Sequence, residues 1–252
     1  MKATQFEFRF RMLIGILVYV LGFWAPWERY TAASATPSTA WLELSSIPAR
    51  LHWLDLGRST QLVTSLAIFF AFAGAALRVW GTAYLGASTM TSASMRADQV
   101  MAAGPYRRVR NPLYLGTWSF SLGVAILMPA QGAIFFLVAI AILYFRLILG
   151  EEDFLARQLG APYLEYKHRV RRLLPSLSPR VPASAVRPLW GVSVLAEIYP
   201  VGMTLCLATL AWRYNVPLLI QCVLVCFGLS LIVRALLPRT GNAGKTGTVE
   251  SA

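Results

Sequence analysis

The chain has 252 residues, of which 57% are hydrophobic and 13% are charged. A soluble domain usually carries charge on about a quarter of its residues, so the composition argues against an ordinary soluble domain. The formal net charge of +12 raises nucleic acid as a partner. The distribution of that charge instead follows the pattern of membrane topology, and we expect no nucleic-acid partner.

Six mostly apolar stretches follow one another along the chain. Several reach the roughly 20 residues that a bilayer helix needs, and aromatic residues flank the shorter ones. They are residues 12–24, 62–77, 113–128, 133–149, 189–212 and 216–237. The pattern predicts an all-α, polytopic integral-membrane bundle of about six transmembrane helices.

The basic residues indicate the orientation of these helices. If the N-terminus is cytoplasmic, the cytoplasmic segments hold every Lys and Arg except Arg29, Arg50, Arg58 and Arg213. This asymmetry is the positive-inside pattern, and it predicts that both termini are cytoplasmic. It also favours contact with anionic membrane lipids. We expect a bacterial inner-membrane protein whose polar segments face the cytoplasm.

Composition divides the chain into four parts. Residues 1–61 are predicted to hold the first transmembrane helix and an outer interfacial loop, and residues 62–175 a core with a helical hairpin over 113–149. Residues 176–237 form a linker and two C-terminal helices, and residues 238–252 a disordered tail. The basic residues before position 12 and the Ala-Ser-Ala at 33–35 also fit a signal peptide, so cleavage of the first stretch stays an alternative.

Isolated polar residues in the last two stretches give weaker signals. Cys206, Cys222 and Cys226 are expected to be small apolar side chains, because two histidines in the whole chain cannot complete a metal site around them. Glu197 is a carboxylate at membrane depth. It is either a functional group or a glutamate hydrogen-bonded within the bundle.

Two polar segments flank the third and fourth apolar stretches. One is GPYRRVRNPLYLG (104–116), and the other is FRLILGEED (145–153). Because only MPAQG (128–132) separates the two apolar stretches, they are predicted to form a tight hairpin whose ends lie side by side. Residues 110–114 should therefore lie close to residues 146–153.

The acidic residues of the second segment need partners, because carboxylates at a membrane boundary are costly unless paired. Glu151 or Glu152 could salt-bridge Arg146 or Arg110, and Glu152 and Asp153 could be solvated. Acidic, basic and tyrosine side chains gathered at such a boundary also suit a zwitterionic ligand that carries a further cation. S-adenosylmethionine, with its sulfonium, ammonium and carboxylate groups, has this character.

Three blocks of sequence resemble a known family. GPYRRVRNPLYLG (104–116) resembles the G-P-Y-x-x-x-R-H-P-x-Y-x-G motif of the isoprenylcysteine carboxyl methyltransferase family and its phospholipid methyltransferase relatives. The Glu-Glu at 151–152 and LGAPYLEYKHRVRRLLP (159–175) are similar to the second family block, and RVWGTAYLG (78–86) to the segment upstream. The blocks occur in the family's order over residues 78–175.

The resemblance implies an all-helical membrane methyltransferase that uses S-adenosylmethionine, with no metal. It places these residues around the cofactor: Tyr106, Arg110, Asn111, Pro112, Tyr114, Gly116, Glu151 and Glu152. It places Tyr163, Tyr166 and Arg169 over the site, toward the substrate. Glu151, Glu152, Arg110 and Arg169 are the expected catalytic residues. The family usually has histidine where this chain has Asn111, which cannot carry a proton at neutral pH.

The resemblance leaves the methyl acceptor open. A lipophilic or membrane-partitioned acceptor is expected, and it could be an isoprenylcysteine-like carboxylate, a phospholipid amine or a small thiol. A second hypothesis is an NADPH-dependent reductase of steroid or enone type, whose cofactor pyrophosphate would bind Arg107, Arg108 and Arg110. Paired glutamates suit a sulfonium better than a polyphosphate. A non-enzymatic membrane protein would leave the clustered polar turn without a role.

Overall fold

The computed structural model describes residues 2–25, 38–85, 102–182, 186–213 and 215–236. These residues form helices and one isolated β-bridge, between Thr39 and Pro129, which confirms the all-α prediction. The elements are α1 (Gln5–Arg9), α2 (Arg11–Trp24), α3 (Ala40–Arg50), α4 (Leu56–Leu85), the 3-10 turn η2 (Gly104–Arg107), α6 (Pro112–Ala125), α7 (Ala130–Leu159), α8 (Ala161–Arg169), α9 (Trp190–Ala196), α10 (Ile198–Arg213) and α11 (Val216–Leu236).

Two helices in the described part of the chain, α4 and α7, are long and apolar enough to cross a membrane. A third span results if α9 and α10, which meet at an angle of 68°, count as one broken helix. Shorter apolar helices occupy the first and last predicted stretches. The helices thus match the apolar stretches in position, while six spans and two cytoplasmic termini stay predictions.

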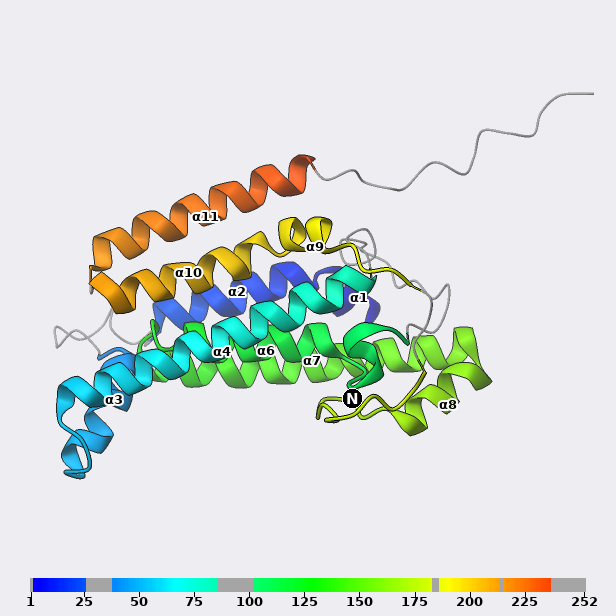
Figure 1. Ribbon diagram of the computed structural model, residues 1–252, viewed down its shortest axis with the longest axis horizontal. Coiled ribbons are helices and arrows are strands. Elements are labelled where there is room, and N and C mark those ends of the chain that lie inside the picture. Colours follow the sequence, from blue (N-terminus) through cyan, green and yellow to red (C-terminus); the bar gives the residue numbers. More distant parts are fainter. Residues whose placement is uncertain (1, 26–37, 86–101, 183–185, 214, 237–252) are drawn as a thin grey trace, which may run out of the picture.

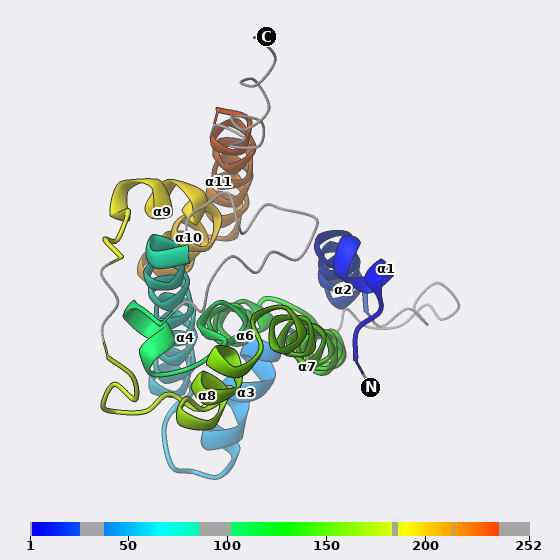
Figure 2. The ribbon, with the colours of Figure 1, turned by 90° about the vertical axis from the view of Figure 1, so that its right-hand side faces the viewer.

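The long helices lie side by side along one axis (Figure 1). Seen end-on, neighbours follow the order α2, α7, α6, α4, α10 and α11 (Figure 2). The α6–α7 hairpin therefore occupies the middle of the bundle. Because the turn between the two helices spans only residues 126–129, the start of α6 lies beside the C-terminal half of α7, as predicted.

Small residues let α4 and α6 pack with their backbones in contact. A Cβ atom added at Gly123 would lie 2.5 Å from the Ala67 carbonyl oxygen. Such close approach is typical of helix pairs in membranes, where van der Waals packing replaces the hydrophobic driving force between helices. This contact fixes α4 against the hairpin, which positions the site described below.

The N-terminal segment packs along α7. Ile14, Val18 and Tyr19 of α2 lie against a cluster that includes Phe136 and Ile140. Ahead of α2, the Ala3 amide donates to the carbonyl oxygen of Arg146 at 3.1 Å. These contacts make the first apolar stretch part of the folded bundle.

Two ion pairs hold the same segment to α7. Both carboxylate oxygens of Glu7 accept from Arg146, each at 2.9 Å, and Lys2 lies 2.6 Å from Asp153. The hydrogen bond from Arg146 is the main reason that the pKa of Glu7 falls to about 2, and a bond from the Thr4 amide adds to the effect. Glu7 is therefore ionised at any physiological pH.

The C-terminal helices pack through α10. Cys206 of α10 and Cys226 of α11 face each other with their sulfur atoms 3.6 Å apart, and all three cysteines are free. They lie in the apolar contact between the two helices, as the sequence predicts. The predicted tail at 238–252 and part of the predicted outer loop fall outside the described residues.

Candidate active site

The basic turn at 104–111 is fastened to the segment that follows α8. The Arg110 amide donates to the Arg171 carbonyl at 2.9 Å, and the Ser176 amide donates to the Arg108 carbonyl at 2.9 Å. The Arg107 side chain adds a bond from Nε to the Val181 carbonyl at 2.9 Å. The Arg108 side chain likewise donates to the carbonyls of residues 176 and 177. The side chains of Arg107 and Arg108 thus hold the segment 176–181 against the turn.

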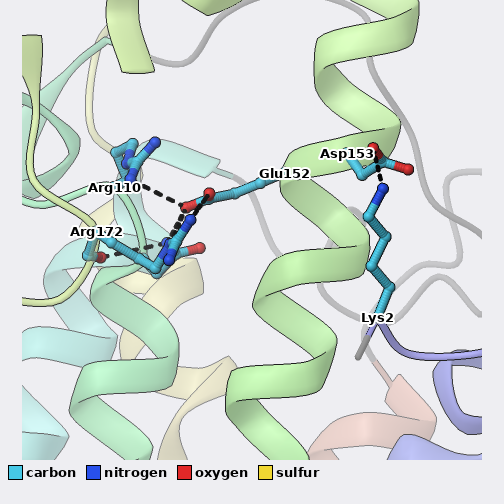
Figure 3. A network of polar contacts seen from close by, with 6 residues as sticks. Lys2, Arg110, Glu152, Asp153 and Arg172 are labelled. Carbon is cyan, nitrogen blue, oxygen red and sulfur yellow. Dashed lines mark hydrogen bonds and ion pairs between the residues drawn. The ribbon is translucent and has the colours of Figure 1, made fainter. Parts of the chain in front are cut away.

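Glu152 is the centre of the site. Its side chain, on α7, is only 3% exposed. Arg172 donates from Nε to both carboxylate oxygens, at 3.2 and 3.1 Å, and from Nη2 to Oε2 at 2.9 Å. Asn111 Nδ2 donates to Oε1 at 3.1 Å, and Arg110 Nη2 lies 3.5 Å from the same oxygen. Figure 3 shows the two guanidinium groups converging on this carboxylate.

This cluster joins three segments that are distant in sequence. Arg110 and Asn111 precede α6, Glu152 lies on α7, and Arg172 follows α8. The predicted contact between residues 110–114 and 146–153 is therefore confirmed. The hydrogen bonds to Glu152 raise the pKa of Arg172, so the guanidinium stays charged and the carboxylate stays paired.

Glu151 points to a different partner. Consecutive helix residues are about 100° apart around the axis, so Glu151 turns away from the cluster around Glu152. Its Oε1 accepts from the Tyr114 hydroxyl at 2.7 Å, which is its one hydrogen bond among the described residues. Tyr114 is held in turn by the ring of Tyr144, 5.5 Å away. Glu151 is thus separate from the ionic cluster around Glu152.

The other acidic and basic groups of the segment are used elsewhere. Arg146 pairs with Glu7, so the predicted salt bridge from Arg146 to Glu151 or Glu152 is wrong. Asp153 pairs with Lys2 and Arg157 on the side of α7 away from Glu152, as Figure 3 shows for Lys2. Among the partners considered from the sequence, Arg110 is the one that reaches Glu152.

Two predicted substrate residues form the packing of α8. Tyr163 and Tyr166 are buried, with ring centres 5.9 Å apart, and the Tyr166 hydroxyl donates to the Tyr106 carbonyl at 2.8 Å. Burial raises the pKa of both phenols, so they stay protonated. Tyr166 thus contacts the turn, and contact of either tyrosine with a substrate stays a prediction.

The structure does not bring Arg169 to the site. Its Nη2 lies 2.6 Å from Glu165 on the exposed face of α8. The helix ends at Arg169 because Val170 is extended, with φ −107° and ψ 131°. The chain direction changes there, and Arg172 instead of Arg169 meets Glu152. Arg172 was not among the residues predicted for the site, although it lies in the block that resembles the family.

Comparison with known families agrees with this geometry. Residues 62–161 match the family model for phospholipid methyltransferases. We call this segment the phospholipid methyltransferase domain, after the family model that it matches. It runs from α4 to the start of α8 and contains the basic turn and both glutamates. The match confirms the resemblance seen in the sequence. No curated protein and no solved structure matched the chain.

The apolar helices and the family match together support a membrane methyltransferase in general terms. Arg172 lies beyond the matched segment. A polar contact from outside the domain therefore completes the cluster around Glu152.

Two motif positions in the phospholipid methyltransferase domain have packing roles. Pro112 opens α6, where its missing amide hydrogen costs nothing. A Cβ atom added at Gly116 would lie 2.8 Å from Arg78 Cγ and 2.9 Å from the Gly74 carbonyl. Gly116 thus faces α4 and admits Arg78. The expected contact of Gly116 with the cofactor stays a prediction.

A second buried ionic network lies across α4. Glu197, at the break between α9 and α10, is 2% exposed. It accepts from Arg78 Nε at 2.7 Å and Nη2 at 3.0 Å, and from the Thr82 hydroxyl at 2.8 Å. Arg78 also donates to Thr117 of α6. Glu197 is therefore hydrogen-bonded within the bundle. The pair of Arg78 with Glu197 could not be predicted from the sequence, because the two residues are far apart along the chain.

An open hollow of about 220 Å³ lies beside the turn. Its walls include Trp80 and Tyr84 of α4, together with Gly104, Arg107 and Arg108. Gly104 has φ +52°, and a side chain there would strike the Tyr84 ring. Glycine at this position therefore lets the turn lie directly on the end of α4.

Proposed function

We propose that the protein is an integral-membrane methyltransferase that uses S-adenosylmethionine and acts on a lipophilic or membrane-partitioned acceptor. The observation that carries the proposal is the meeting of the basic turn with Glu151 and Glu152 inside the phospholipid methyltransferase domain. The positive-inside pattern supports a site that faces the cytoplasm, in a bacterial inner membrane.

The side chains present fit the cofactor. Arg110 is 8% exposed, and its Nε and Nη1 are buried with no hydrogen-bond partner among the described residues. A buried donor without a partner costs about 1–3 kcal/mol, and a carboxylate on the ligand would supply the missing acceptors. Glu151, held by Tyr114, offers a negative charge to an ammonium or sulfonium. The site thus complements both ends of a sulfonium amino acid.

Each residue then has a distinct task. Bound S-adenosylmethionine supplies a methyl group on a positively charged sulfur. Glu152 orients Arg110 and is fully occupied by its partners, so it is a positioning residue. Glu151 binds the cofactor cation. It is also the nearest base for an amine acceptor, which must lose a proton, whereas a carboxylate or thiolate needs none.

Asn111 fits this scheme without acid–base chemistry. Its amide nitrogen donates to Glu152 and to the Arg172 carbonyl, at 3.1 and 3.2 Å. Asparagine here ties the turn to the segment after α8, a task that needs a hydrogen-bond donor and no titratable proton. The departure from the usual family histidine therefore preserves the architecture of the site.

The NADPH alternative depends on arginines that have other partners. A pyrophosphate would need the guanidinium groups beside the hollow, but Arg107 and Arg108 already donate to backbone carbonyls of residues 176–181. The unpartnered donors belong to Arg110, beside the carboxylates. That placement favours a zwitterionic ligand over a polyphosphate.

Methyl transfer in a bilayer tests the proposal. The purified protein, placed in lipid nanodiscs with methyl-labelled S-adenosylmethionine, is expected to label a lipid or a small thiol identified by mass spectrometry. Glu151→Gln should abolish labelling, while Glu165→Gln, an exposed carboxylate on α8, should retain it. Wild-type protein that labels no lipid, fatty acid or thiol from its native membranes would contradict the proposal.

A further inference from the structure

The N-terminal segment, residues 2–11, lies against α7 just before Glu151. Three of the α7 residues that it contacts are spaced by four and three positions, so they share one face of the helix. They are Arg146, Gly150 and Asp153. The Ala3 amide donates to the Arg146 carbonyl at 3.1 Å, and a Cβ atom added at Gly150 would lie 3.5 Å from Ala3 Cβ. The segment is therefore fixed beside the part of α7 that carries the candidate site.

Phe8 extends this contact toward Glu151. Phe8 is buried in the apolar cluster that includes Leu147 of α7, and Tyr114 packs against the same cluster. Leu147 and Glu151 are four residues apart, so they are neighbours on the surface of the helix. Tyr114 donates to Glu151 at 2.7 Å. Phe8 therefore belongs to the surroundings of the pair formed by Tyr114 and Glu151.

Arg11, the first residue of α2, packs over Phe8. Its guanidinium carbon lies 4.3 Å from the centre of the Phe8 ring, and its Nη1 donates to the Phe8 carbonyl at 3.1 Å. The side chain is half-buried. Its charge acts on both members of the neighbouring pair, Tyr114 and Glu151. Arg11 thus brings a positive charge to Glu151 from outside the cluster around Glu152.

This charge matters because burial disfavours the ionised form of a carboxylate. The adjacent charge of Glu152 has the same effect on Glu151. The groups that face Glu151 from other elements are the phenols of Tyr114, Tyr106 and Tyr163 and the guanidinium of Arg11. A phenol ordinarily ionises near pH 10. At neutral pH, Arg11 is therefore the charged group among these four.

We propose that Arg11, held over Phe8 by the N-terminal segment, is a positioning residue of the active site that keeps Glu151 ionised for the cation of the cofactor. The inference rests on the proposed function and adds a residue to it. The segment 2–11 lies outside residues 62–161, so the family match does not imply this contribution. Without Arg11, Glu151 takes up a proton at a higher pH and loses the negative charge that binds the cofactor.

The pH dependence of S-adenosylhomocysteine binding tests the role of Arg11. The wild type and Arg11→Gln, both in zwitterionic nanodiscs, are titrated calorimetrically between about pH 5 and about pH 8. Binding should weaken as the pH falls and Glu151 takes up a proton. In Arg11→Gln the midpoint of this loss should lie about one pH unit higher, which makes the affinity about tenfold weaker on the acid side.

The alkaline end of the titration separates the charge from the fold. There Glu151 is ionised in both proteins, so Arg11→Gln should bind at least as tightly as the wild type. An unchanged midpoint would overturn the inference. Arg11→Gln that binds at no pH would overturn it as well, because the residue would then act by maintaining the fold.

Two further variants serve as matched controls. Arg11→Lys keeps the positive charge and should keep the wild-type midpoint. Arg9→Gln removes the same charge from a nearby exposed position and should not move the midpoint. A shift as large in Arg9→Gln as in Arg11→Gln would mean that net charge is responsible, which overturns the inference.

The wild type separates failure of this inference from failure of the proposed function. A wild type that binds no S-adenosylhomocysteine at any pH contradicts the proposed function. A wild type that binds it with the same midpoint as Arg11→Gln contradicts only the role of Arg11.

Discussion

Replacing Glu152 by glutamine separates a positioning role from a binding role. The Glu152 carboxylate is the shared counter-charge of Arg110 and Arg172. Glutamine keeps the size of the side chain and an acceptor oxygen for Asn111, but it removes the negative charge. We therefore expect Glu152→Gln to destabilise the fold strongly, and Glu151→Gln, which alters one bond with Tyr114, to destabilise it little.

The magnitude follows from the two guanidinium groups. Removing one partner of a buried ion pair costs about 3–5 kcal/mol. Arg172 is 33% exposed and can turn toward water, whereas Arg110 is 8% exposed and cannot. We therefore take the lower end, about 3 kcal/mol. For a chain of this size each kcal/mol shifts the melting temperature by about 2–4 °C, so a fall of roughly 6–12 °C is expected.

The assay is thermal unfolding of the wild type and each variant, purified in the same detergent and heated at the same rate. Glu165→Gln is the matched control, since its exposed pair with Arg169 contributes at most about 1 kcal/mol. Glu151→Gln should melt close to the control and yet fail to bind S-adenosylhomocysteine. If Glu152→Gln also melts within about 2 °C of the control, the carboxylate is not the centre of a buried ionic cluster and the reasoning is refuted.

Three further predictions concern neighbouring residues. Arg172→Met should weaken S-adenosylhomocysteine binding in calorimetry by releasing Glu152, whereas Arg169→Met should leave the affinity unchanged. Gly116→Ala should lower stability by about 1–3 kcal/mol, measured by thermal unfolding, because the added methyl group strikes α4. The pKa of Glu7 is about 2 in the folded state against a usual 4.5, so its contribution is present above pH 4.5 and lost as pH falls toward 2. The protection of the amides of residues 3–10 against hydrogen exchange, relative to the intrinsic exchange rate at each pH, should therefore fall over that range by an amount on the order of 1 kcal/mol at this partly exposed pair. Glu7→Gln should remove this change.

The hairpin at the centre of the site was predictable because it depends on local chemistry. Apolar length, a short turn with Pro129 and the proline that opens α6 all act over a few residues. Once two helices are joined by a short turn, their far ends must meet. The contacts of Asn111 with Glu152 and of Tyr114 with Glu151 follow from that constraint.

The ion pairs that complete the site were not predictable, because they join segments far apart in sequence. Glu197 meets Arg78 only because α10 packs on α4. Arg146 meets Glu7 only because the first helices return along α7. Arg172 lies at the site where Arg169 was predicted, and the cause is local. The extended conformation of Val170 ends α8 and changes the direction of the chain.

The most direct test of the account is a pair of calorimetric titrations of the purified protein, one with S-adenosylhomocysteine and one with NADPH. The account predicts saturable binding of S-adenosylhomocysteine, its loss in Glu151→Gln, and no binding of NADPH. Saturable binding of NADPH together with no binding of S-adenosylhomocysteine would contradict the account.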